Sequence, residues 1–79
     1  MIVKVITPEK CLFEGEAKAV TVPSLQGPFT MLEHHAAIVA ILQQGNIVIT
    51  LNDDTVKTIP IKGGCCEQHD NAVIVCGER

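Results

Sequence analysis

Polar and apolar residues alternate along several short stretches of this chain. The alternation is clearest at residues 46–51 and returns at residues 55–61. A period of two residues is typical of a strand that turns one face toward the core. Asn52, Asp53 and Asp54 separate the two stretches, so this part of the chain predicts a β-hairpin.

Other short apolar runs predict further strands, at residues 1–7, 11–13, 16–22, 65–68 and 72–76. Strands about ten residues apart, separated by turn-forming residues, are typical of an all-β sandwich or barrel. Residues 36–42 are ambiguous, because seven consecutive apolar residues suit either a buried strand or a short helix. Since several of them are β-branched, we expect a strand there.

Residues 27–36 interrupt this pattern. They read GPFTMLEHHA, follow no regular period, and have apolar runs on both sides. Irregular segments held on a rigid scaffold commonly carry the binding residues of a domain. We therefore interpret residues 27–36 as a loop that presents a binding surface.

Composition narrows the possible functions. The 79 residues make one small domain, and the net charge of −3 with six scattered basic residues argues against nucleic-acid binding. No apolar run approaches the ~20 residues that a membrane-spanning helix needs, and the N-terminal stretch lacks the pattern of a signal peptide. We expect a cytosolic domain that is not inserted into the membrane.

The four cysteines, Cys11, Cys65, Cys66 and Cys76, are expected to be reduced thiols in the cytosol. Cys65 and Cys66 are neighbours, so a strand would point them to opposite faces. The two glycines just before them, Gly63 and Gly64, allow a bulge or a close approach of two backbones.

Candidate chemistry is sparse. Glu33, His34 and His35 could bind a metal or transfer protons, but neighbours on an extended chain point apart and no H-E-x-x-H motif is present. The cysteines near His69 lack the paired knuckle spacing of a structural zinc site. The residues therefore predict no catalytic, cofactor or metal site, and a domain that works by presenting a surface.

Several stretches together resemble a known family. They are TPEKCLFEGEAKAV at residues 7–20, then Pro23, Gly27, Phe29 and the pair His35-Ala36, followed by the later glycines and the ending at residues 71–75. Their order and spacing are similar to the N-terminal β-sandwich domain of the epsilon subunit of F-type ATP synthases, called delta in mitochondria. The resemblance covers nearly the whole of residues 1–79.

The resemblance implies a flattened two-layer β-sandwich of about ten short strands. It further implies a non-catalytic subunit without cofactors, which docks on the gamma subunit and the polar loops of the c-ring and couples ring rotation to ATP synthesis. Such a subunit lies peripherally on the cytoplasmic face of the bacterial inner membrane. The resemblance places the partner interface at Gly27, Pro28, Phe29, Leu32, His35 and Ala36.

Two departures from the family pattern are visible. Many relatives have an acidic residue where this chain has Pro28, and Glu33 is a candidate to replace it. Many relatives also continue into a C-terminal pair of helices, whereas residues 1–79 hold no C-terminal helical domain, so we expect a naturally short subunit. A small cytosolic metal-binding or carrier module is the alternative, although the expected hairpin tips lack the lysine that a carrier domain modifies.

Overall fold

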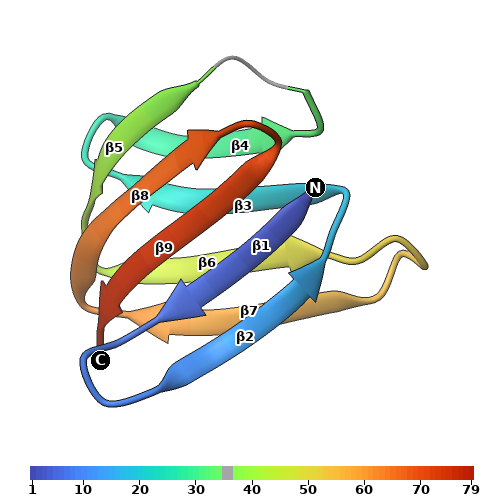
Figure 1. Cartoon of the computed structure of the whole chain (residues 1–79). Helices are drawn as coiled ribbons and strands as arrows, with labels where there is room; N and C mark the ends of the chain where they lie inside the picture. The colour runs from blue at the N-terminus through green and yellow to red at the C-terminus, as the bar shows by residue number, and fades with distance from the viewer. Residues whose placement is uncertain (35–36) are drawn as a thin grey trace.

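The computed structural model describes residues 1–34 and 37–79. Within these residues the chain forms nine strands and no helix (Figure 1). The strands are β1 (Ile2–Ile6), β2 (Cys11–Glu16), β3 (Ala19–Ser24), β4 (Gly27–Leu32), β5 (Ile38–Leu42), β6 (Gly45–Thr50), β7 (Val56–Ile61), β8 (Gly63–His69) and β9 (Ala72–Glu78). The described residues thus contain no helix of the length and hydrophobicity that a membrane span requires.

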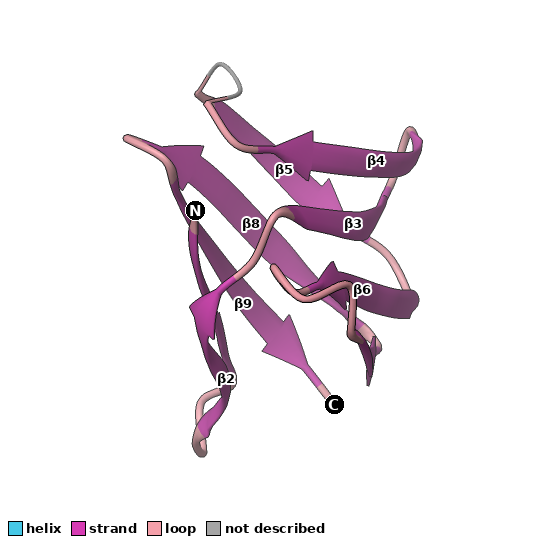
Figure 2. Ribbon diagram, turned by 90° about the vertical axis from the view of Figure 1, so that its right-hand side faces the viewer, coloured by secondary structure: helices cyan, strands magenta, loops and turns pink. Residues whose placement is uncertain are grey.

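The strands form one curled sheet in the order β2-β1-β9-β8-β5-β3-β6-β7, with β4 added beside β3. The curl divides the sheet into two layers that face each other (Figure 2). One layer consists of β2, β1, β9, β8 and β5, and the other consists of β4, β3, β6 and β7. A single paired position, Ser24 with Leu42, joins β3 of one layer to β5 of the other. The predicted all-β sandwich is confirmed, with nine strands in the described residues where the resemblance implied about ten.

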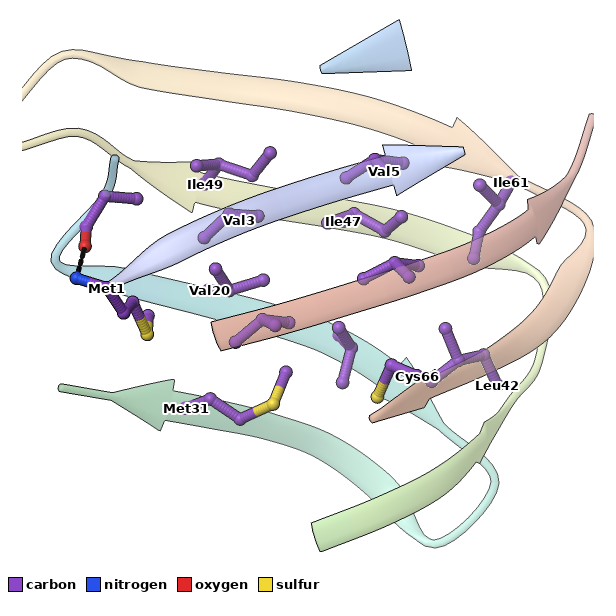
Figure 3. Packing of buried hydrophobic residues seen from close by; sticks show 14 residues of the cluster. Met1, Val3, Val5, Val20, Met31, Leu42, Ile47, Ile49, Ile61 and Cys66 are labelled. Atoms are coloured by element: carbon purple, nitrogen blue, oxygen red, sulfur yellow. Dashed lines mark hydrogen bonds between the residues drawn. The ribbon is translucent and has the colours of Figure 1, made fainter. Parts of the chain in front are cut away.

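The core lies between the two layers, where alternate side chains from each strand point inward (Figure 3). Val3, Val5 and Val75 project from one layer, and Ile47 and Ile49 project from the other, all without exposed surface. Aliphatic, β-branched side chains dominate because they fill a pleated surface well. The alternation that predicted strands at residues 46–51 is therefore the imprint of this core.

One hairpin occurs where the sequence predicted it, and a second joins two of the other predicted strands. β6 pairs with β7 in antiparallel register around the turn at Asn52–Asp54, and β8 pairs with β9. The β8–β9 turn consists of Asp70 and Asn71, whose φ angles of 53° and 60° are those of a type I′ turn. Asn and Asp tolerate this left-handed conformation better than most residues, so the local sequence determines the turn.

Gly64 confirms the predicted close approach of two backbones. A Cβ atom at this position would lie 2.1 Å from the carbonyl oxygen of Cys76. Its φ of 141° is also one that residues other than glycine rarely adopt. Glycine is therefore required where β8 begins to pair with β9.

The interpretation of residues 27–36 as an irregular loop is wrong for its first six residues, which form strand β4. β4 pairs with β3 along its whole length, from Gly27 opposite Ser24 to Leu32 opposite Ala19. In the described part of the chain β4 has no second neighbour, so Pro28, which lacks an N–H group, is tolerated there. Outward Pro28 and Leu32 obscure the alternation that would otherwise have predicted this strand.

Candidate docking surface

Strand β4 distributes the predicted interface residues over two faces. Phe29 points toward the interior and packs against the core. Pro28 and Leu32 point outward, and 54% of Leu32 is exposed. The predicted His35 and Ala36 lie outside the described residues. The described residues Phe29, Pro28 and Leu32 therefore do not form a single surface as the loop interpretation implied.

The hairpin of β3 and β4 is closed by side-chain contacts as well as by the strand ladder. The Ser24 hydroxyl donates a short hydrogen bond to the carbonyl oxygen of Gly27, beside the two-residue turn. Farther along, the hydroxyl oxygens of Thr21 and Thr30 lie 2.8 Å apart across the strands. These contacts hold β4 in a fixed register, so its exposed residues are presented on a rigid element.

The end of β4 is tied to the N-terminus and to the β8–β9 hairpin. The ammonium group of Met1 lies 2.7 Å from Oε1 of Glu33. The backbone N–H of His34 donates to Oδ1 of Asn71 at 3.0 Å, and Nε2 of Gln68 donates to the carbonyl oxygen of Leu32 at 3.2 Å. This end of the sandwich is thus cross-linked by polar contacts.

Glu33 already forms an ion pair within this network. Its hydrogen bond to the ammonium group and the positive charge of that group lower the pKa of the Glu33 carboxyl. The carboxylate keeps part of its surface in solvent. The suggestion that Glu33 replaces a family acidic residue in contacting a partner must therefore account for its existing ion pair.

Large exposed apolar side chains gather where the β3–β4 turn meets β5. Val39, Ile41 and Leu25 are 71%, 62% and 60% exposed. They surround a hollow of about 380 Å³, which Phe29 also lines. We call Leu25, Phe29, Val39 and Ile41 the corner patch. Exposed apolar side chains that are grouped in this way commonly mark an interaction surface.

The corner patch is held together by the junction of the two layers. The backbone N–H of Leu25 donates to the carbonyl oxygen of Ile41 at 2.9 Å, next to the Ser24–Leu42 pair. Sequence reasoning included Phe29 but missed the other three residues. The apolar run at residues 36–42 was the signal that could have found them. A strand with one face in the core needs only every second residue to be apolar, so a continuous run implies apolar side chains on the outer face as well.

Outward positions continue the corner patch across the neighbouring strands. Ile41 lies opposite Cys65, which lies opposite Cys76 on β9. At the next outward position along each strand, Val39 lies opposite Glu67 and Glu67 lies opposite Ile74. Apolar character therefore extends from the patch over β8 and β9, broken by charged side chains.

The alternative of a metal-binding module gains no site from the described residues. Among residues 1–34 and 37–79, no three His, Cys, Asp or Glu side chains are grouped closely enough to hold a metal ion. Cys65 is exposed and Cys66 is buried, which confirms that the two neighbours point to opposite faces. His69 pairs instead with Asp70, with Nδ1 and Oδ2 2.9 Å apart.

Comparison with known proteins relates the whole chain to one family. The profile of the family described as ATP synthase, Delta/Epsilon chain, beta-sandwich domain matches residues 1–79. The ATP synthase epsilon chain of Chlorobaculum tepidum is 36% identical over 75 residues, covering 95% of this chain and 85% of that protein.

Two solved structures share the fold. A chain in the structure of the Euglena gracilis mitochondrial ATP synthase with OSCP, F1 and c-ring matches with a TM-score of 0.93 at 18% identity. A chain in the structure of the Tetrahymena thermophila mitochondrial ATP synthase central stalk and c-ring matches with a TM-score of 0.84 at 20% identity. Both matches cover all of this chain, which spans 51% and 63% of those two longer chains.

Proposed function

Because the chain belongs to the delta/epsilon family of ATP synthase subunits, we propose that it is a non-catalytic subunit of the central stalk of a rotary ATP synthase. In this role it docks on the gamma subunit and the polar loops of the c-ring, and it transmits ring rotation to the catalytic head. The supporting observation is that the family profile spans residues 1–79, the stretch that holds the strands of the sandwich. The subunit works peripherally, on the cytoplasmic face of the bacterial inner membrane.

The corner patch is the surface that we assign to gamma. Its exposed side chains lie on paired strands and on a two-residue turn, so docking costs little ordering of the backbone. Burying Leu25, Val39 and Ile41 removes three large apolar side chains from water, which is the main favourable term in such an association. Phe29, from the predicted interface, lines the same hollow.

The end of the sandwich near Glu33 and His34 is the part that we assign to the ring. The β4–β5 connection, with the predicted interface residues His35 and Ala36, begins here, and the Asp70–Asn71 turn lies beside it. Polar and charged side chains at this end suit a polar loop better than an apolar partner. Pro28 and Leu32 extend this surface along the outward face of β4.

A matched pair of substitutions tests the assignment to gamma. Ile41→Asp places a charge in the corner patch, and Val56→Asp makes the same change at an exposed apolar strand residue of the other layer. We expect the first variant to lose co-purification with gamma and the second to retain it. Circular dichroism of each purified variant verifies that the sandwich remains folded.

The outcomes separate the surface from the function. Failure of the folded wild-type chain to bind folded gamma would refute the proposed function itself. Binding that survives Ile41→Asp but is lost with Val56→Asp would move the gamma interface to the opposite layer and leave the central-stalk role intact. For the ring, we expect His35→Ala to weaken assembly with the c-ring while the stability of the isolated domain is unchanged.

A further inference from the structure

Cys65 and Cys76 are direct cross-strand partners. In the antiparallel pairing of β8 and β9, Cys65 lies opposite Cys76, and both side chains are exposed on the outer face of the layer. Neighbouring outward positions on these strands hold Glu67 and Ile74. The two thiols are therefore adjacent to each other and accessible to small molecules.

The turn between the strands determines the type of this pair. A two-residue turn at Asp70–Asn71 makes His69 and Ala72 a hydrogen-bonded pair, and such pairs recur at every second position along the ladder. Cys65 and Cys76 are four positions from His69 and Ala72, so they too are a hydrogen-bonded pair. The Cα atoms of such a pair are about 5.5 Å apart, within the range that a disulfide bond spans.

The other two cysteines are not suited to bond with either thiol. Cys66 is buried and faces the core, away from Cys65. Cys11 lies on β2 opposite Ile6, and Ile6 lies opposite Cys76, so β1 separates the two cysteines. Two strand spacings amount to roughly 10 Å, beyond the reach of a disulfide bond. Cys11 also donates its thiol hydrogen to the carbonyl oxygen of Phe13.

We propose that Cys65 and Cys76 form a reversible redox modification site, a dithiol that low-molecular-weight disulfides of the glutathione type oxidise to an intramolecular disulfide. The thiolate of one cysteine attacks a sulfur of the small disulfide, which gives a mixed disulfide and releases one small thiol. The second cysteine then attacks the protein sulfur of that bond and releases the other small thiol. The protein loses two electrons and two protons, and the small disulfide becomes two thiols.

The surroundings of Cys76 affect the rate rather than the outcome. Partial desolvation raises the pKa of the exposed Cys76 thiol, and the neighbouring Cys65 thiol and Glu67 carboxylate raise it further. A smaller thiolate fraction slows attack by Cys76 at neutral pH. We therefore expect the step in which Cys76 attacks to accelerate as the pH rises above neutrality.

Oxidation of the folded chain tests this proposal. The reduced protein is incubated with oxidised glutathione, and the thiols that remain free are then blocked. The intact mass and the peptide map are measured. Relative to the reduced protein blocked in the same way, we expect two fewer blocking groups on the intact protein and a 65–76 link in the peptide map. Cys11→Ser is expected to behave like the wild type. Cys65→Ser is expected to stop at a mixed disulfide on Cys76, which needs at least roughly tenfold more oxidant because ring closure is lost.

Two results would overturn the proposal. One is stable addition of glutathione to both Cys65 and Cys76 of the wild type without ring closure. The other is oxidation that proceeds through Cys11 to covalent dimers while Cys65 and Cys76 stay reduced. Neither result depends on the variants folding, and neither bears on docking to gamma.

Discussion

The ammonium group of Met1 and the carboxylate of Glu33 form an ion pair at 2.7 Å, although the two residues are 32 positions apart in the chain. The same ammonium group donates to the carbonyl oxygen of Ala17 at 3.0 Å, while the Met1 side chain is buried in the core (Figure 3). The start of β1, in one layer, is thereby fastened to the end of β4, in the other. One charged group thus helps to hold the two layers of the sandwich together.

This ion pair predicts a dependence of stability on pH. The pKa of Glu33 is lowered in the folded state, so its contribution is present above the ordinary value of 4.5 and is lost as the pH falls through the folded value. Thermal unfolding of the wild type and Glu33→Gln should differ near neutrality and converge in acid. Equal differences at both pH values would contradict a role for the Glu33 charge.

Gly64→Ala is expected to destabilise the domain by about 3–5 kcal/mol, because the added Cβ atom would collide with the Cys76 carbonyl oxygen at a φ that alanine avoids. Gly27→Ala is the matched control. Gly27 also has a positive φ, of 121°, but an added Cβ atom would meet nothing within 4 Å. Its expected cost is about 1 kcal/mol from backbone strain alone. Urea unfolding measures both values, and equal costs would contradict the collision.

Neighbouring residues test whether β4 is a strand with one buried face. Met31 has no exposed surface, so Met31→Ala leaves a cavity and should cost about 2–5 kcal/mol. Leu32, the next residue, points outward, and Leu32→Ala should change stability by no more than about 0.5 kcal/mol. Chemical denaturation of both variants is the measurement. Similar losses at both positions would indicate that the segment does not alternate.

Phe29 and Leu25 separate packing from docking within the corner patch. Phe29 packs against the core, so Phe29→Ala should lower both the unfolding free energy and the affinity for gamma. Leu25 is mostly exposed, so Leu25→Ser should lower the affinity while the midpoint of unfolding stays unchanged. Unfolding curves and binding titrations on the same samples distinguish the two effects. A Leu25→Ser variant with unchanged affinity would remove the turn from the docking surface.

The sequence was sufficient to predict the strands where one face alone is apolar. Ile47 and Ile49 alternate with more exposed positions, and Asp70-Asn71 has the residues that a tight turn requires. β4 was not predicted because its outward residues include Pro28 and Leu32, so polar and apolar residues do not alternate along it. Periodicity reports burial, so it fails where an outward face is itself apolar.

The candidate surface was harder to predict for a related reason. The apolar run containing Val39 and Ile41 indicated an element but not which of its residues would be left in solvent. That depends on the pairing of β5 with β8, since register determines which residues face outward. The opposition of Cys65 and Cys76, 11 positions apart, likewise follows from the register of β8 and β9.

The position of β1 has a consequence for synthesis. β1 is paired on one side with β2 and on the other with β9 in parallel register, so the first strand of the domain lies beside its ninth. The core around Val3 and Val5 stays incomplete until Val73 and Val75 are available. During translation β1 therefore cannot complete its pairing until β9 has left the ribosome, and the domain finishes its folding only then.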